Sequence, residues 1–177
     1  MKEKITLSTA VGRIAWGYVF LHFNLNINTF DLVPDWVCYA LILSVLPVLG
    51  EVQRSILLLR TMTIGLCIWK TVTWINPLFQ GFLELLASVI SLYYHFQLLT
   101  DLAAIGEKMG YPDTKKLLNL RTGRTLIATG VSLPLNISLE GIWSMIPLAA
   151  MSIIMIWTLV VLFSLGDYLR KIQISED

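Results

Sequence analysis

Two apolar segments, residues 53–75 and 78–104, each carry a regular line of polar and ionisable side chains. The residues in each line are three or four positions apart, which places them on one face of a helix. The first line consists of Arg60, Thr63, Cys67, Lys70, Thr71 and Trp74, and the second of Glu84, Ser88, Ser91 and His95. Charged groups are costly inside apolar segments, so they predict either contacts between helices or a functional site.

The connection between the two segments predicts which side chains meet. Asn76-Pro77 is typical of a tight turn, so we expect the segments to form an antiparallel hairpin. Counting equally from the turn matches Lys70 with Glu84, Thr63 with Ser91, Arg60 with Tyr94 and His95, and Arg54 with Asp101. Lys70 and Glu84 are therefore expected to form an ion pair or to share a bridging water.

This polar seam has two interpretations. Its side chains could hold two helices together, as polar residues do between membrane spans. Alternatively, Lys70 and Glu84 could face a cavity that binds a charged or zwitterionic ligand or passes a proton. Trp74, one turn beyond Lys70, would then supply an aromatic wall suited to a flat or cationic ligand.

A second group of polar residues lies in the predicted loops at the same end of the hairpin. It includes His22, Asn24, Asn26, Asn28, Asp31, Asp35, Asn136 and Glu140. Asn and Asp are common in ordinary turns, which is the simpler explanation. Loops over a helical scaffold also often carry binding groups, so this region could cover the site. On that second interpretation the candidate ligand-binding residues are Lys70, Glu84, His22, Trp74, Asn24, Asp31 and Asp35.

Catalytic interpretations are weaker. Cys38 could approach His22, and Cys67 lies on the stripe next to that of His95, but a nucleophilic cysteine needs contact with its base and a third orienting group. Cys67 is about two turns from the level of His95, so that dyad is not expected. The chain contains neither Gly-x-Ser-x-Gly nor His-Glu-x-x-His. We therefore do not favour an enzyme, and we expect no cofactor and no metal.

The elements that would position these residues are six apolar segments. They cover about residues 9–26, 34–49, 53–75, 78–104, 117–135 and 139–169. We expect one all-α domain, a bundle of six transmembrane helices. Gly50 is expected to end the second helix, and residues 105–116 to form a long loop. Trp16 and Trp157 are expected to pack between helices.

The fifth segment is the least regular, because Arg121 and Arg124 occupy its first turns. It could be tilted, or its first turns could lie along the membrane surface with both arginines reaching the headgroups. The two arginines could also hold a phosphate or a lipid headgroup, although an inner-face position explains them equally well.

The distribution of basic residues predicts the orientation. When the loops are assigned alternately to the two faces of a membrane, twelve of the thirteen Lys and Arg residues fall on one face. The exception is Lys70. Basic residues gather on the cytoplasmic side, so both termini are expected there in a multi-pass protein of the cell membrane. Hydrophobic residues make up 56% of the 177 residues and charged ones 14%, against about 25% charged in soluble domains. We expect the lipid bilayer as a partner, and the net charge of +1 gives no reason to expect nucleic acid.

The outline is similar to that of the substrate-binding S-components of energy-coupling-factor vitamin transporters. Those proteins have six spans, both termini inside, and a pocket capped by outer loops. They dock a partner through small residues, often Ala-x-x-x-Ala, on the first span, where this chain has Ser8 and Gly12 at the same interval. The resemblance implies a small-molecule binding or transport subunit with an outward-facing site. The alternative is a non-catalytic membrane partner or structural subunit whose polar seam only packs helices.

Overall fold

The computed structural model describes the backbone of residues 5–22, 26–27, 30–31, 34–76, 82–132 and 145–176. This part of the chain is all-α apart from a two-residue strand pair. The helices are α1 (Leu7–His22), α2 (Trp36–Val52), α3 (Leu59–Ile75), α4 (Phe82–Lys108), α5 (Thr114–Ser132) and α6 (Met145–Glu176). A 3-10 helix, Arg54–Leu58, precedes α3, and β1 (Asn26–Ile27) pairs antiparallel with β2 (Phe30–Asp31).

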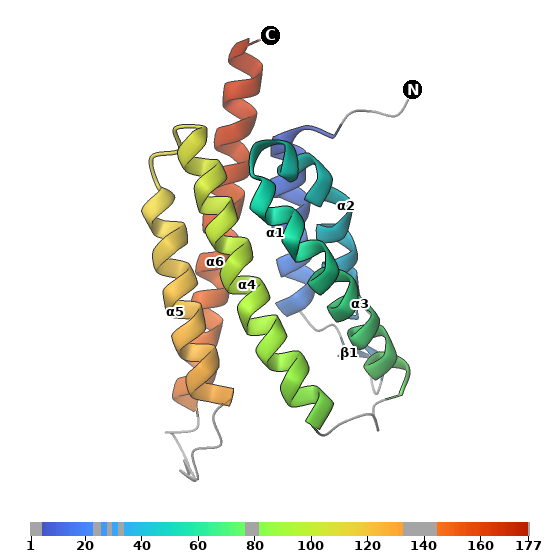
Figure 1. The fold of residues 1–177 in the computed structure, drawn as a ribbon. Helices are drawn as coiled ribbons and strands as arrows, with labels where there is room; N and C mark the ends of the chain where they lie inside the picture. Colours follow the sequence, from blue (N-terminus) through green and yellow to red (C-terminus); the bar gives the residue numbers. More distant parts are fainter. Residues whose placement is uncertain are drawn as a thin grey trace.

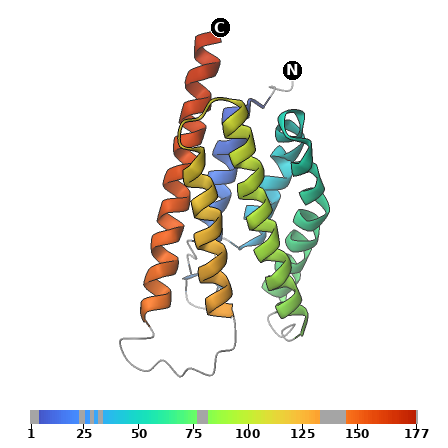
Figure 2. The same cartoon turned by 60° about the vertical axis from the view of Figure 1, so that its left-hand side comes forward.

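The six helices form a closed ring. Each packs against the next one in the sequence, and α6 returns to pack against α1. Successive helices run in opposite directions, so α1 begins and α6 ends at the end of the bundle that carries the α4–α5 turn (Figures 1 and 2). The all-α prediction is confirmed. Each predicted segment overlaps one helix, with boundaries shifted by several residues.

The α4–α5 turn is shorter than the predicted loop of residues 105–116. Gly110 adopts φ +74°, a left-handed conformation that glycine reaches without strain. The Tyr111 N–H donates to the Gly106 carbonyl at 2.8 Å, which closes the end of α4. Helix therefore continues to Lys108 and resumes at Thr114, and α4 and α5 lie side by side as an antiparallel pair.

Gly50 does not end α2 as the sequence suggested. The helix continues to Val52, and the Gln53 N–H donates to the Leu49 carbonyl at 2.9 Å. A Cβ on Gly50 would come within 2.5 Å of the Leu57 side chain. A side chain at this position would therefore require the Leu57 side chain, which is 42% exposed, to move.

Small residues bring α1 and α6 together. The Ser8 hydroxyl donates to the Gly166 carbonyl at 2.9 Å. A Cβ on Gly166 would lie 3.9 Å from the backbone nitrogen of Gly12, which is ordinary van der Waals contact. Ser8 and Gly12, the small residues compared above with a partner-docking face, thus pack against α6 of the same chain.

This contact predicts a size limit at position 166. Gly166→Ala should change stability by at most about 1 kcal/mol, since the added methyl group meets no clash. Gly166→Leu should lower the free energy of unfolding by about 1–3 kcal/mol, because its extra carbons would push α6 from α1. Gly65→Leu is the control, because a Cβ on Gly65 has open space. Chemical unfolding in detergent measures all three, and equal losses for Gly166→Leu and Gly65→Leu would contradict the packing argument.

Two stretches of the described chain, Arg54–Ile75 and Ala149–Ser175, are long and apolar enough to cross a membrane, and Trp36–Val52 is a shorter apolar helix. Large apolar side chains cover the outside of these helices, including Ile153, Ile156 and Val160 on α6. Trp16 and Trp157 also lie outside, 53% and 41% exposed, rather than between helices as predicted. Trp16 instead meets Phe163 edge-on at the surface, with ring centroids 5.9 Å apart.

Candidate functional site

A pocket of about 530 Å³ lies between α3, α4 and α5. Its ionisable lining residues are Lys70 from α3, Glu84 and His95 from α4, and Arg124 from α5. Hydroxyl groups complete the polar lining, from Ser88, Ser91, Thr125 and Thr129. The predicted residues Lys70, Glu84, Ser88, Ser91 and His95 are therefore brought together at one pocket.

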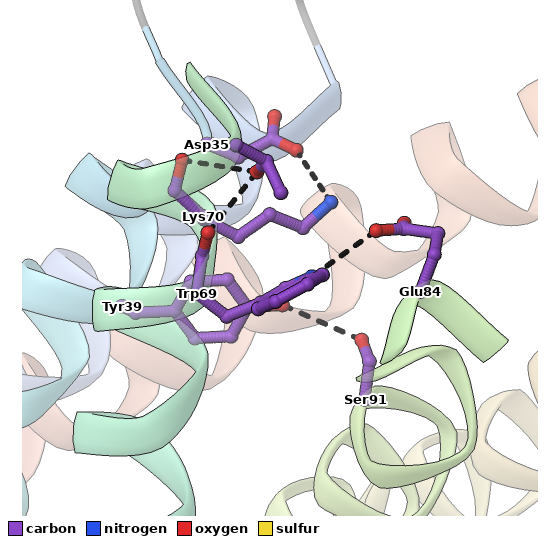
Figure 3. Close-up of polar contacts among 7 residues, drawn as sticks. Asp35, Tyr39, Trp69, Lys70, Glu84 and Ser91 are labelled. Atoms are coloured by element: carbon purple, nitrogen blue, oxygen red, sulfur yellow. Dashed lines mark hydrogen bonds and ion pairs between the residues drawn. The ribbon is translucent and has the colours of Figure 1, made fainter. Parts of the chain in front are cut away.

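The direct ion pair predicted between Lys70 and Glu84 does not form, and the alternative of a bridging water stays a prediction. Lys70 Nζ lies 3.2 Å from Asp35 Oδ2, at the start of α2 (Figure 3). Each of these side chains is a little over a quarter exposed, so the pair is a partly solvated one. Asp35, predicted as a rim residue, thus serves as the partner of Lys70.

Glu84 has a different partner. Trp69 Nε1 donates to Glu84 Oε2 at 3.1 Å, across the space between α3 and α4 (Figure 3). Sequence analysis missed Trp69 because it lies one position off the stripe that contains Lys70. An indole N–H normally finds an acceptor when partly buried, and this is the signal that could have identified it.

The middle of the ring is filled by aromatic side chains and His95. Tyr18 Oη and His95 Nδ1 share a hydrogen bond of 2.8 Å, and both residues are buried. Tyr94 meets His95 edge-on, with ring centroids 5.1 Å apart. Tyr39 Oη lies 3.4 Å from Ser91 Oγ. These contacts join α1 and α2 to α4 through the centre of the bundle.

The other residue pairs that were predicted at equal distances from the turn do not contact each other. Arg60 is exposed and does not line the pocket, although it was matched with His95. Thr63 is buried but donates to the Leu59 carbonyl at 2.8 Å on its own helix. Cys67 Sγ contacts the Trp36 carbonyl oxygen at 3.7 Å. Arg60 therefore faces the outside and Cys67 faces α2, whereas Thr63 meets Tyr94 of α4 and not Ser91.

Arg124 is the main residue that sequence analysis misplaced. It lies about 15 Å along α5 from Thr114, well inside the bundle rather than at the inner face. Its Nη1 donates to His22 Nε2 at 3.1 Å, and its guanidinium carbon lies 5.1 Å from the centre of the Tyr18 ring. The preference of basic residues for one side of a membrane predicts Arg124 at the end of its helix. It does not predict that the side chain lines the pocket.

Arg121, one turn earlier, has a local environment. Its guanidinium carbon lies 4.5 Å from the Phe96 ring centre, and Nη1 donates to Thr100 Oγ1 at 3.2 Å. A cation over an aromatic face is stabilised by the ring quadrupole. Arg121 therefore joins α5 to α4 and does not line the pocket.

The remaining candidates lie outside the pocket or outside the described residues. His22 does not line the pocket but accepts a hydrogen bond from Arg124, which does. Trp74 does not line the pocket. Asn24 falls outside the described residues. Asp31 is described only as a backbone position that pairs with Asn26. The proposed cover over the site is therefore untested.

The cysteine–histidine pairs that the sequence offered do not form hydrogen bonds within the described residues. Cys38 is buried, and a Cβ on Gly17 would come within 3.4 Å of its sulfur. His22 and His95 contact Arg124 and Tyr18 respectively. Both cysteines are better understood as packing residues.

A second buried polar group lies at the other end of the bundle. Asp101 is 2% exposed and accepts hydrogen bonds from Ser55 and Gln97. Sequence analysis matched it with Arg54, but the 3-10 helix after α2 presents Ser55 instead. Lys108 Nζ donates to Gln53 Oε1 at 2.7 Å beside it. These bonds fix the α2–α3 connection onto α4.

Comparison with known protein families, curated proteins and solved structures finds no match to this chain. The functional argument therefore rests on the geometry of the pocket and on the surface of the bundle.

Proposed function

We propose that the chain is an integral protein of the cell membrane that crosses the bilayer six times. The surface of the helices supports this. Only 33% of the most apolar window of α6 and 22% of that of the α3 segment is buried within the bundle. The core helix of a soluble protein would be mostly buried, whereas an apolar helix with an exposed apolar face requires lipid or a partner.

The proposed orientation places both termini in the cytoplasm. Lys108, Lys115 and Arg170 lie at or near the end of the bundle where α1 begins and α6 ends (Figure 1). Arg54, at the α2–α3 connection, lies at this end as well. Basic residues favour the cytoplasmic face. Lys70 and Glu84 then lie towards the outer face, near the α3–α4 connection.

Within this membrane protein, the pocket between α3, α4 and α5 is proposed to bind a small molecule, for storage, sensing or transport. One observation carries this proposal: about 530 Å³ of space lined by Lys70, Glu84 and Arg124 together with hydroxyl groups. Ligand pockets commonly have volumes of about 300–1,000 Å³ and a few convergent polar groups. Charges within a helix bundle are costly unless they serve such a site or pair with one another.

The alternative is a non-catalytic membrane partner or structural subunit. The bonds between Tyr18 and His95, Tyr39 and Ser91, and Trp69 and Glu84 favour it, because they satisfy polar groups across helices. This alternative leaves the volume between Glu84 and Arg124 without a role. The resemblance to S-components extends here to a binding function only, since Ser8 and Gly12 contact α6.

Ligand-induced stabilisation tests the binding proposal. A panel of vitamins, amino acids and nucleobases should contain a compound that raises the melting temperature of the purified protein. A ligand at one hundred times its Kd stabilises by about 2.7 kcal/mol. Lys70→Ala should weaken this response because Lys70 lines the pocket and pairs with Asp35, whereas Arg60→Ala on the same helix should retain it. A wild-type protein that responds to no compound but co-purifies with a membrane partner would support the alternative.

A further inference from the structure

The charges that line the pocket are unevenly compensated. Lys70 is paired with Asp35. Arg124 has no carboxylate partner among the described residues, and its two close neighbours are an imidazole nitrogen and an aromatic ring. Because arginine can only donate, His22 Nε2 must accept from it and adds no negative charge. Arg124 therefore brings a positive charge into the bundle that no carboxylate of the described residues balances.

Glu84 presents the opposite case. Its carboxylate accepts from the neutral indole N–H of Trp69, and the structure gives it no ion pair with any described Lys, Arg or His. Among the described residues, the pocket thus contains one cation, Arg124, and one anion, Glu84, that form no ion pair. Arg124 lies within the bundle, where an isolated charge is expensive, so it is expected to meet an anion in the functional state. Glu84 lies partly exposed in the first turn of α4, where its carboxylate is available to a cationic group.

The two charges lie at different depths. Arg124 stacks on Tyr18, which is bonded to His95, so Arg124 lies near the level of His95. Glu84 lies about 16 Å further along α4 towards its first residue. Ser88 and Ser91 line the pocket between these two levels. A small compact ion would reach only one of the two charges, whereas an elongated molecule could reach both.

We propose that the pocket binds an elongated zwitterion, with its anionic group on Arg124 and its ammonium group on Glu84. This inference rests on the proposed binding function. The anionic group is a carboxylate or a phosphate, since the planar guanidinium donates paired hydrogen bonds to either. Ser88 and Ser91 supply hydroxyl groups to the middle of the ligand.

A cysteine in the pocket wall allows the binding function and the ligand class to be tested separately. Ala128→Cys places a thiol in the wall, and Leu126→Cys, 69% exposed on α5 and not in the pocket lining, is the matched control. Both are made in a protein with Cys38→Ala and Cys67→Ser. A membrane-impermeant maleimide, added from the outside, should label the Ala128→Cys protein and leave the lipid-facing thiol of the control unmodified.

Protection from labelling then identifies the ligand class. The probes are ω-aminobutyrate, ω-aminohexanoate and ω-aminooctanoate, with ω-aminohexyl phosphate to separate carboxylate from phosphate recognition. Octanoate and octylamine carry only one of the two charges. The longer zwitterions should slow labelling about tenfold more than either singly charged compound at equal concentration, since one added ion pair of about 1.4 kcal/mol has that effect.

Variants of the two charges complete the test. Glu84→Gln should reduce protection by ω-aminooctanoate to the level of octanoate, and Arg124→Gln should reduce it to the level of octylamine. Arg124→Lys keeps the positive charge but lacks the planar guanidinium, so it shows whether the loss in Arg124→Gln comes only from misfolding. It should give protection between that of the unsubstituted Arg124 protein and that of Arg124→Gln. An Ala128→Cys protein that is not labelled would overturn the proposed pocket and this inference with it. Labelling that no zwitterion slows, or protection that survives both Gln substitutions, would overturn the zwitterion and leave the pocket intact.

Discussion

Ile156→Asp is expected to destabilise the protein in the membrane by about 3–4 kcal/mol, the difference between aspartate and isoleucine near the centre of a membrane helix. Ile156 is 58% exposed on α6, so less than half of its surface is buried within the bundle. In a water-soluble bundle the same substitution would be a surface change, within about 0.5 kcal/mol. The expected result therefore distinguishes a lipid environment from water at a single position.

Ile174→Asp is the matched control. Ile174 is 68% exposed on the same helix but lies beyond the predicted span, so its replacement should stay within about 0.5 kcal/mol. The measurements are the yield of folded protein in the membrane fraction after alkaline extraction and the midpoint of unfolding. Equal, small effects at both positions would contradict the six-span proposal, whatever the outcome at the pocket.

The helices could be predicted because the formation of each helix depends mainly on the residues within it. Long apolar runs with few charges predict helices that cross a membrane, and the turn at Asn76-Pro77 predicts an antiparallel pair. Helix ends were less predictable. Gly50 is a common helix-ending residue, but its role depends on Leu57, a contact outside the helix. The end of α4 depends on Gly110, whose left-handed conformation fixes the turn locally.

The partners of the polar residues were not predictable from spacing alone. Periodicity places Lys70 and Glu84 at one level, but it does not fix the rotation of α3 about its axis. In the structure that rotation directs Lys70 towards Asp35 on α2 and leaves Trp69 to face Glu84. Neighbouring residues on a helix are about 100° apart around its axis. A rotation of α3 by that angle therefore replaces Lys70 with Trp69 on the face towards α4.

Arg124 shows the opposite difficulty. The general preference of basic residues for one side of a membrane fits Arg124, but that preference carries no information about the depth of its side chain. The short α4–α5 turn places Arg124 within the bundle, where it contacts residues of α1. The depth of a charge depends on where the preceding helix ends, and here that end is set by Gly110.

The hydrogen bond between Tyr18 and His95 should show strong coupling. Tyr18→Phe leaves His95 Nδ1 without its partner in a buried site, and His95→Leu does the same to the Tyr18 hydroxyl. An unsatisfied buried polar group costs about 1–3 kcal/mol, so each single substitution should lower the free energy of unfolding by that amount. The double substitution should cost clearly less than the sum, because it leaves no polar group unpaired. Chemical unfolding of the four proteins in the same detergent measures the coupling.

The same four proteins bear on the choice between a binding site and a structural seam. His95 lines the pocket, whereas Tyr18 does not. If the bond only packs helices, the double variant should keep its fold, and Tyr18→Phe and His95→Leu should affect any ligand response equally. If the pocket binds a ligand, the variants with His95→Leu should lose more of the response than Tyr18→Phe does at matched stability. Additive losses of stability would instead show that the two side chains do not depend on one another, and the buried centre would then have to be held by Tyr39 and Tyr94.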